Sequence, residues 1–246
     1  MTAELWGLIF KGVWITVQLT IYSAALGAVV AFVTGIARTS RFWIVRFLSG
    51  LYVEVFRGTS ALVLMFWLFF VVPLAFNWQF VPMWAATLAL GLSYGAYGSE
   101  IVRGGIAAVA PAQREAGIAL SFSPWQRLRL VILPQAVPEM LPPFNNLLVE
   151  LLKGTALVSL LGVGDISFAA QLARLATGES GSIYFTILLM YFVLAFLLTR
   201  VMRLAESRAK ARIGQKPEKG GGIVRKLGIR QETDQSFGMT VVGGPS

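Results

Sequence analysis

Cysteine and histidine are both absent from the 246-residue chain, and charged residues make up only 13% of it. The two absences exclude disulfide bonds, thiol chemistry, zinc or haem ligation and a histidine general base. The charged fraction is about half that of an ordinary soluble domain. In contrast, 56% of the residues are hydrophobic. This balance predicts an integral membrane protein.

Long uncharged runs define the expected membrane spans. Residues 12–37 and 181–199 carry no charge, and a run of about 20 apolar residues suffices to cross the hydrocarbon core. The uncharged run 58–99 is too long for one span and is interrupted by PLAFNWQFVP. A less apolar stretch follows later in the chain. We therefore expect an all-α fold with about five transmembrane helices, at residues 12–37, 58–74, 83–103, 143–164 and 181–201.

Basic residues fall on one set of connections between these spans. The connection after the first span carries Arg38, Arg41 and Arg46, the connection at 104–135 is also basic, and the end of the chain has many lysines and arginines. Because basic connections stay in the cytoplasm, we expect a multi-pass protein of the cell (inner) membrane with its N-terminus outside and its C-terminus inside. The tail at 209–246 is expected to be disordered, cytoplasmic and close to anionic lipid, with no nucleic acid bound.

Small residues recur at four-residue spacing in two expected spans. Such faces allow helices to approach closely within a membrane. The pattern predicts tight packing within one bundle or, as a sharper alternative, contact with a partner subunit. The residues concerned are Ser23, Gly27, Ala31 and Gly35 in one helix and Gly91, Gly95 and Ser99 in another.

The connection at 104–135 has the start and stop signals of two short helices. Pro111 suits the first position of a helix, where its missing N–H group costs nothing. Ser123 and Gln126 form a capping-box pattern before a second helix, which is expected to end near Ile132. We therefore expect a two-helix loop at the cytoplasmic membrane surface.

Three roles are open to such a loop. A DNA-binding helix-turn-helix is disfavoured because membrane spans tether it at both ends. An amphipathic surface resting on lipid is the simplest structural role. A docking element for a cytoplasmic protein is favoured by Glu115, which lies between two ordered elements and has only Arg114 as an obvious partner.

The loop resembles the EAA loop of binding-protein-dependent ABC importer permeases. That motif consists of Glu-Ala-Ala, a glycine four residues later, and an aliphatic pair followed by Leu-Pro. Here Gly117 stands at the third motif position and Ser121 at the glycine position; a serine in a left-handed conformation would cost roughly 1 kcal/mol relative to glycine. The residues that the resemblance assigns to ATPase coupling are Arg114, Glu115, Ala116, Gly117, Ser121, Leu133 and Pro134.

Further segments resemble the polar amino acid branch of the same family, and the resemblance covers residues 12–208. Gly154 stands where many relatives have aspartate. The matching segments are EVFRGT at 54–59, GLSYGAYGSEIVRGGI at 91–106, LPQAVPEMLPPFNN at 133–146 and LLKGTALVSLLGV at 151–163.

The resemblance implies a type I ABC importer transmembrane domain with a cytoplasmic coupling loop. Its implied partners are an ABC ATP-binding subunit, a second permease subunit that is homologous or identical, an extracytoplasmic solute-binding protein and membrane lipid. The chain has no Lys-Ser or Lys-Thr and hence no Walker A motif. We therefore expect a transporter subunit and not an enzyme, with no cofactor bound by this chain and with ATP and Mg on the partner.

Polar residues inside the fourth span are candidates for a translocation path or gate. Asn146, Glu150 and Lys153 share one helical face, and Thr155 follows them. Ionisable groups in a membrane usually face a cavity or each other. The favoured interpretation is a structural Glu150–Lys153 ion pair at i, i+3 spacing, and contact with a polar solute is the functional alternative.

Two further pairs at i, i+3 spacing are expected at helix ends. They are Glu54 with Arg57 and Glu100 with Arg103.

The expected function is ATP-driven import of a polar amino acid or similar zwitterion. Residues 52–71 and 154–160 resemble subunits for ectoine and hydroxyectoine, which are zwitterionic compatible solutes. The alternative is a secondary transporter or channel independent of ATP, which would predict internal repeats and charge relays through the spans. A membrane-embedded enzyme is a weaker alternative, for which Glu150 and Lys153 are the only candidate groups.

Overall fold

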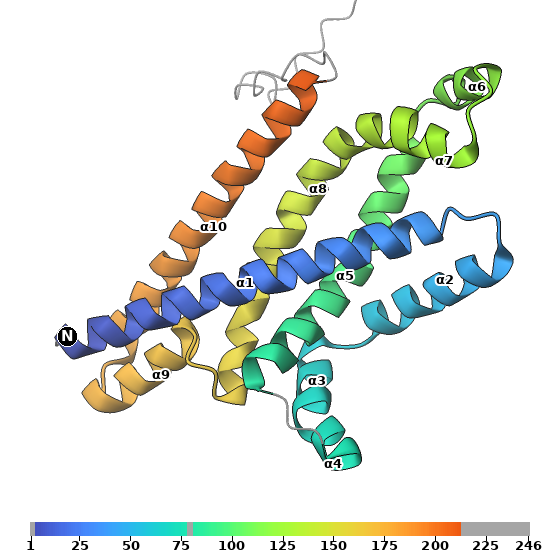
Figure 1. Ribbon diagram of the computed structural model, residues 1–246. Helices are drawn as coiled ribbons and strands as arrows, with labels where there is room; N and C mark the ends of the chain where they lie inside the picture. Colours follow the sequence, from blue (N-terminus) through green and yellow to red (C-terminus); the bar gives the residue numbers. More distant parts are fainter. Residues whose placement is uncertain (1–2, 78–80, 213–246) are drawn as a thin grey trace, which may run out of the picture. The chain divides into compact units, whose positions relative to one another are not determined.

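The computed structural model describes residues 3–77 and 81–212, and every secondary-structure element in that part of the chain is helical (Figure 1). Most of these elements are long α-helices joined by short connections. In chain order they are α1 Ala3–Ala37, α2 Trp43–Gly58, α3 Ala61–Phe66, the π-helical η1 Trp67–Val71, α4 Val72–Phe76, α5 Pro82–Ala108, α6 Pro111–Ala119, α7 Pro124–Gln126, the π-helical η2 Arg127–Ile132, α8 Leu133–Gly154, the 3-10 helix η3 Thr155–Leu161, α9 Ile166–Thr177 and α10 Ser180–Arg212.

The long helices have the dimensions of membrane spans. Within the described residues, three segments, Leu5–Ala37, Pro124–Leu161 and Ser180–Ala211, are long and apolar enough to cross a membrane, and the bent pair of α2 with the helices after it is a fourth candidate. The remaining expected span is α5. Its 27 residues extend about 40 Å, which is long enough to cross a membrane. It is not among the candidate spans that are apolar enough, and many of its buried residues are glycine, alanine, serine or threonine.

The second span differs from its prediction. Instead of one helix at 58–74, the segment Trp43–Gly58 and the segment Ala61–Phe76 meet at a bend of 100°. Thr59 and Ser60 adopt extended backbone conformations at the bend, which interrupts the helical hydrogen bonds. The connection after α1 is therefore short, and α2 occupies most of the predicted cytoplasmic loop.

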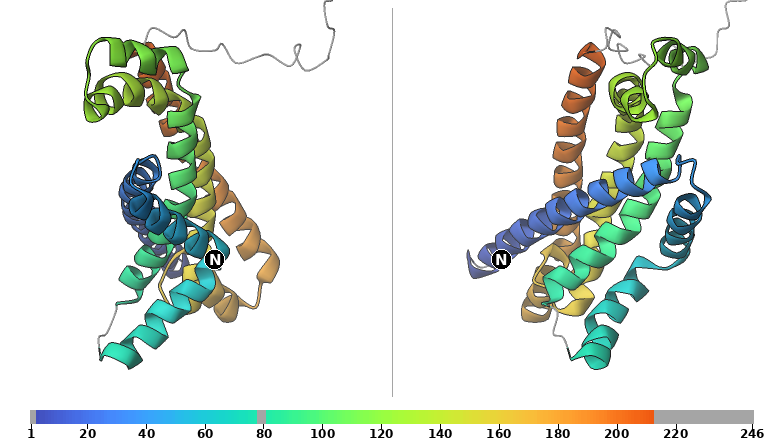
Figure 2. Two further views of the ribbon diagram at one scale, coloured as in Figure 1. Left: turned by 90° about the vertical axis from the view of Figure 1, so that its right-hand side faces the viewer. Right: turned by 45° about the vertical axis from the view of Figure 1, so that its right-hand side comes forward.

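The small-residue faces of α1 and α5 pack against each other, so the prediction of packing within one bundle is confirmed. A Cβ atom added to Gly27 would lie 3.3 Å from the Gly91 carbonyl oxygen, and one added to Gly35 would lie 2.8 Å from the Ser99 carbonyl oxygen. Ser23 is fully buried. Because the glycines of each helix leave room for the backbone and side chains of the other, α1 crosses α5 at close range (Figure 2).

The fourth span begins earlier than predicted. The second helix of the two-helix loop was expected to end near Ile132, but α7, η2 and α8 form one continuous helical segment from Pro124. Proline removes a backbone donor and disturbs the preceding turn, and the wide π-helical turn lies directly before the proline-rich α8, which contains Pro138, Pro142 and Pro143.

The fifth span continues beyond its predicted end at 201, since α10 reaches Arg212. Residues 209–212 of the tail predicted to be disordered are thus helical, and the rest of that tail lies outside the described residues.

Asp165 fixes α9 against α1 and α10. The fully buried carboxylate accepts hydrogen bonds from the backbone N–H groups of Phe168 at 2.9 Å and Ser167 at 3.2 Å, and the Tyr191 hydroxyl lies 3.4 Å away. The Ile166 N–H donates to the Thr16 hydroxyl of α1 at 3.2 Å. Asp165 lies outside the candidate spans, and burial raises the pKa of its carboxyl above the ordinary value.

Candidate functional site

The two-helix loop has the local structure that the sequence predicts. Pro111 occupies the start of α6. The Ser123 hydroxyl accepts from the Gln126 N–H at 3.3 Å, and the Ser123 N–H donates to the Gln126 side chain at 2.8 Å, so the capping box is confirmed. Ser121 has φ +58°. It therefore takes the left-handed conformation for which the family pattern uses glycine.

The loop is tied to both of the long helices that flank it. An Arg114 Nη2 donates to the Ile106 carbonyl of α5 at 2.7 Å, and the Gln135 amide of α8 donates to the Gln113 side chain at 3.3 Å. Gly117 is buried, and an added Cβ would lie 2.9 Å from Arg127 Cγ. Glycine at this motif position thus makes room for the aliphatic part of the Arg127 side chain.

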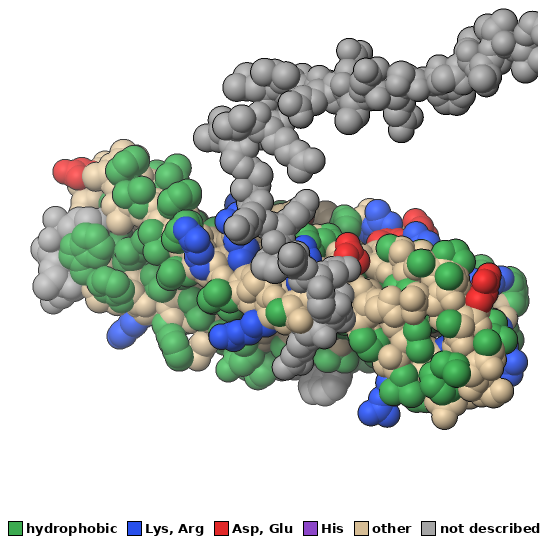
Figure 3. Space-filling model, turned by 90° about the horizontal axis from the view of Figure 1, so that it is seen from above, with side chains coloured by type: hydrophobic (Ala, Val, Ile, Leu, Met, Phe, Trp, Pro, Cys, Tyr) green, Lys and Arg blue, Asp and Glu red, His purple; other side chains and the backbone are tan. Residues whose placement is uncertain are grey.

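The outer surface of the loop is left uncovered. Glu115 and Ala116 are exposed, and no ion pair involving Glu115 occurs in the described part of the chain. Figure 3 views the molecule from the end that carries α6 and α7 and shows hydrophobic side chains interspersed with basic ones there. The exposed apolar side chains of the loop include Ile118, Leu120, Trp125 and Leu130.

The other motif residues lie nearer the bundle. Leu133 is half-buried and packs with Leu128 against the core cluster between α1, α5 and α8, whereas Pro134 is exposed. Leu128, in the π-helical η2, is also half-buried there.

Glu100 of α5 is the centre of a charged cluster that joins three helices. Arg38, at the end of α1, donates a hydrogen bond to Glu100 Oε1, and Arg103 Nε donates to Oε2 at 2.8 Å. Arg57 Nη1, at the end of α2, lies 3.6 Å from Oε1. Glu54 forms no ion pair within the described residues, so the predicted Glu54–Arg57 pairing is corrected: the packing of α2 on α5 brings Arg57 to Glu100 instead.

Two tyrosines extend this polar region along α5 to α8. The Tyr97 hydroxyl donates to the Arg57 carbonyl at 3.2 Å, and the Arg57 guanidinium carbon lies 5.4 Å from the centroid of the Tyr97 ring. The Tyr94 hydroxyl donates to the Glu150 carbonyl at 3.2 Å. A Cβ atom at Gly154 would approach the Tyr94 hydroxyl oxygen to 2.9 Å, so the glycine that replaces the family's aspartate accommodates Tyr94.

Three polar residues of α8 lie beside the tyrosines on the surface of the chain. Asn146, Glu150 and Lys153 are all exposed. No ion pair joins Glu150 to Lys153 in the part of the chain that the structure describes, which corrects the predicted structural pair. Holding two long exposed side chains together costs conformational entropy that an exposed ion pair barely offsets. Thr155 is fully buried and donates to the Leu152 carbonyl at 2.6 Å, so it does not line this surface.

We use the name polar face for the groups of α2 and α5 that these contacts connect, together with the three exposed polar residues of α8. The two tyrosines were not predicted from the sequence. Their three-residue spacing in GLSYGAYGSE was the available signal, because it puts both hydroxyls on one side of a helix. The polar face consists of Arg57, Tyr94, Tyr97, Asn146, Glu150 and Lys153.

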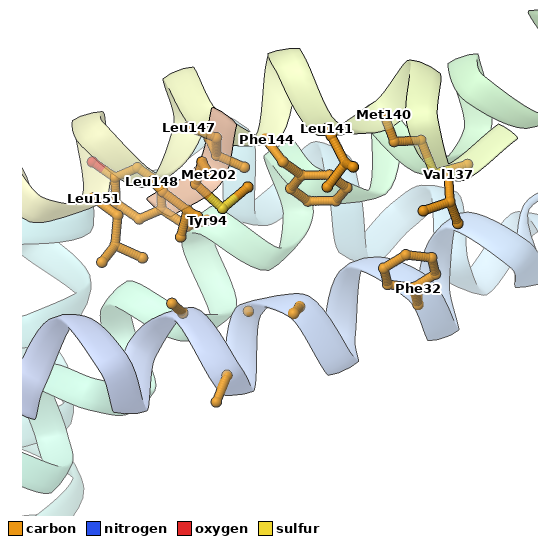
Figure 4. Close-up of a pocket in the computed structure, with 14 residues that line it drawn as sticks. Phe32, Tyr94, Val137, Met140, Leu141, Phe144, Leu147, Leu148, Leu151 and Met202 are labelled. Carbon is orange, nitrogen blue, oxygen red and sulfur yellow. The ribbon is translucent and has the colours of Figure 1, made fainter. Parts of the chain in front are cut away.

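A cavity of about 370 Å³ lies between α1, α5, α8 and α10 and shares Tyr94 with the polar face. Figure 4 shows Phe32, Phe144 and Met140 directed into it. Tyr94 is the one residue with a polar side chain among the 14 that line it. A charged or zwitterionic ligand would find too few polar partners there. The polar face, and not this cavity, is therefore the candidate solute site.

The described residues contain no group of three or more side chains that could hold a metal ion.

Comparisons with known proteins agree with this arrangement. Residues 6–211 match the family described as "Binding-protein-dependent transport system inner membrane component". The chain is 49% identical over 202 residues to the "Probable amino-acid ABC transporter permease protein y4tF" of Sinorhizobium fredii (strain NBRC 101917 / NGR234), covering 80% of this chain and 85% of that protein. It is 32% identical over 204 residues to the "Glutamine transport system permease protein GlnP" of Escherichia coli (strain K12), covering 82% and 93%.

A solved structure described as "Crystal structure of an amino acid ABC transporter with histidines" superposes with a TM-score of 0.76 and 28% sequence identity, covering 85% of this chain and 100% of that chain. The family match spans nearly all of the described residues, including both the two-helix loop and the polar face. The chain therefore belongs to the family of binding-protein-dependent transport system inner membrane components, the permease subunits of ABC importers.

Proposed function

We propose that this permease imports a polar amino acid through a path lined by the polar face. The observation that carries the proposal is the exposure of Asn146, Glu150 and Lys153 on the membrane-spanning helix α8. Lipid is a poor environment for these groups, and ionisable residues in membrane helices usually face a partner or an aqueous cavity. An amino acid carries both charges, which a carboxylate and an ammonium group can complement.

A second permease subunit, identical or homologous, covers the polar face in this proposal. The single chain leaves the face open, so a solute path enclosed on all sides needs a partner. Arg57 and Tyr97 already contact each other, and they form one edge of the path. Two facing subunits bury the polar groups away from lipid and leave water and solute between them.

The two-helix loop is proposed to dock into an ABC ATP-binding subunit, which binds ATP and Mg. Leu120 and Trp125 are exposed on the same loop as Glu115, which forms no ion pair within the described residues, and this combination suits a protein surface with apolar and basic groups. The loop continues into α8 without interruption, and Arg114 ties it to the end of α5. Movement of the loop on nucleotide binding would therefore displace the two helices that carry Tyr94, Tyr97 and Glu150.

The orientation in this proposal has the N-terminus outside and the loop and C-terminus in the cytoplasm. The positive-inside rule supports it, because Arg41, Arg46, Arg127 and Arg129 all lie on the loop side. A solute-binding protein delivers the substrate from the opposite side. The names of the relatives refer to amino acids and glutamine, which supports an amino acid over the narrower expectation of ectoine or hydroxyectoine.

Reconstitution into liposomes with the ATP-binding subunit and the solute-binding protein tests this function. We expect uptake of labelled polar amino acids only when ATP is present on the side of the liposome membrane that carries the two-helix loop. Excess unlabelled amino acid should compete, and ectoine should not. Uptake by the permease alone, without ATP, would instead make the chain a secondary carrier.

A further inference from the structure

An open basin of about 1030 Å³ lies beside the two-helix loop, away from the polar face residues of α8. The connection between α1 and α2, the end of α5, and the helices α6, α7 and η2 form its walls. No aspartate or glutamate lines it. Its most distinctive feature is the set of five arginines in its lining, Arg38, Arg41, Arg103, Arg114 and Arg127.

The positive charge of the basin is only partly balanced by the protein itself. Arg38 and Arg103 share the single carboxylate of Glu100, and Arg114 donates to a backbone carbonyl. Arg41 and Arg127 form no ion pair within the described residues. Five guanidinium groups and one neighbouring carboxylate leave an excess of positive charge, which favours an anionic ligand.

The basin also has an apolar side that a small soluble anion would leave uncovered. Ile36, Val45 and Leu128 line it together with the arginines. Trp43 and Ile44, which stand in the sequence between the lining residues Arg41 and Val45, are 65% and 64% exposed. The basic groups thus adjoin an apolar helix surface in a protein that spans a membrane, at the level where α1 and α5 end.

We propose that the basin binds the headgroup of an anionic phospholipid. Arginine side chains hydrogen-bond phosphate oxygens strongly and often through two N–H groups. Basic pockets between membrane helices on the cytoplasmic side are suited to anionic headgroups. The phosphate lies among Arg41, Arg114 and Arg127, and the acyl chains extend along the exposed apolar surface of α2. The lipid thereby links the α1–α2 connection to the two-helix loop.

Native mass spectrometry of the intact complex with its ATP-binding subunit, in mild detergent, tests the proposal. Phosphatidylglycerol and phosphatidylcholine are added at matched concentrations. The test variant carries Arg41→Gln and Arg127→Gln, and the matched control carries Arg46→Gln and Arg129→Gln. The control removes the same charge at nearby positions, Arg46 in α2 and Arg129 in η2, and neither of these positions lines the basin.

We expect phosphatidylglycerol, but not phosphatidylcholine, to be retained by the unaltered complex and by the control. The test variant should bind phosphatidylglycerol about 25-fold more weakly, since each of the two arginines near an anionic lipid surface contributes about fivefold. Arg41 lies in an exposed connection, so Arg41→Gln alone should not disturb folding, and it should weaken binding about fivefold. This single variant replaces the double variant if the double variant does not fold.

Three results would overturn the proposal. Equal retention of both lipids, or unchanged retention of phosphatidylglycerol by the test variant, would show that the arginines do not select a headgroup. Complete displacement of the lipid by excess inorganic phosphate would make the ligand a free phosphate. If the permease alone retained phosphatidylglycerol but the complex with the ATP-binding subunit did not, the basin would instead bind an acidic surface of that subunit.

Discussion

At the scale of single residues, Ser121 supplies the left-handed backbone conformation in the turn between α6 and α7. Its φ of +58° is unfavourable for residues with a Cβ atom. The turn is closed by the Ser121 and Phe122 N–H groups, which donate to the Ile118 and Gly117 carbonyls at 2.8 and 3.0 Å. The local hydrogen bonds and the capping box at Ser123 hold the serine in this conformation.

We predict that Ser121→Gly stabilises the two-helix loop. Glycine adopts the same conformation without steric cost, so the local free energy of opening should rise by about 1 kcal/mol. Amide hydrogen exchange of α6 measures this directly. Exchange should slow in the variant, and faster exchange would mean that the turn is not what limits the loop.

Asp165 provides a second test at the residue scale. Because burial raises the pKa of its carboxyl, the folded chain binds a proton there more tightly than the unfolded chain, and this contribution to stability is lost as the pH rises above the ordinary value of 3.8. Asp165→Asn keeps a capping oxygen without the charge, so its thermal unfolding near pH 7 should match or exceed that of the unaltered protein. Asp165→Ala loses the cap and should cost about 1 kcal/mol. Equal stability of all three proteins would contradict the capping role.

The packing of α1 on α5 is the main structural feature at the scale of helices. The sequence predicted that these faces pack tightly within one bundle, because small residues at four-residue spacing specify a face in any helix, but it did not predict which two helices would pair. Uncharged runs likewise predicted the long helices. The bend after Gly58 was not predictable in this way, since neither Thr59 nor Ser60 is a strong helix breaker and tertiary packing decides whether the helix continues.

We predict that Gly35→Ala disturbs this helix pair. The new methyl group would lie 2.8 Å from a backbone oxygen of α5, which cannot rotate away, and such overpacking costs about 1–3 kcal/mol. Gly7→Ala is the matched control on the same helix, because nothing lies within 4 Å of its Cβ position. The two variants are compared by thermal unfolding in detergent. Similar unfolding temperatures would mean that α1 and α5 separate easily.

The candidate site was only partly predictable for the same reason. The loop motif and the face shared by Glu150 and Lys153 follow from spacing along one helix. The contacts of Arg57 with Glu100 and of Tyr97 with Arg57 connect different helices. They depend on how the helices cross, which no local pattern specifies.

At the scale of the whole molecule, the two-helix loop, for which we propose a docking role, is joined to the polar face through the two helices α5 and α8. The chain is a transporter subunit and not an enzyme, and the family match removes the alternative of a carrier unrelated to ABC proteins. The continuous helical segment from Pro124 and the end of α5 are the mechanical links between the two regions.

The polar face makes a further prediction at this scale. Glu150→Gln and Lys153→Met each remove one charge from a position that is exposed in the single chain, so folding of the chain should be unaffected. If these groups contact the two charges of an amino acid, uptake should fall at least tenfold, because charged hydrogen bonds contribute about 1.5–3 kcal/mol. Uptake is measured in the reconstituted complex. Full activity of both variants would exclude the two side chains from the path.

The most direct measurement is the number of amino acids transported per ATP hydrolysed, compared among the unaltered complex, Glu115→Lys and Glu139→Lys. Both variants reverse one exposed charge, but only Glu115 lies on the proposed docking surface. We expect Glu115→Lys to fold and yet to lose the coupling between ATP hydrolysis and uptake, while Glu139→Lys behaves as the unaltered complex does. An unchanged ratio in Glu115→Lys would contradict the central claim that this loop transmits the motion of the ATP-binding subunit to the membrane helices.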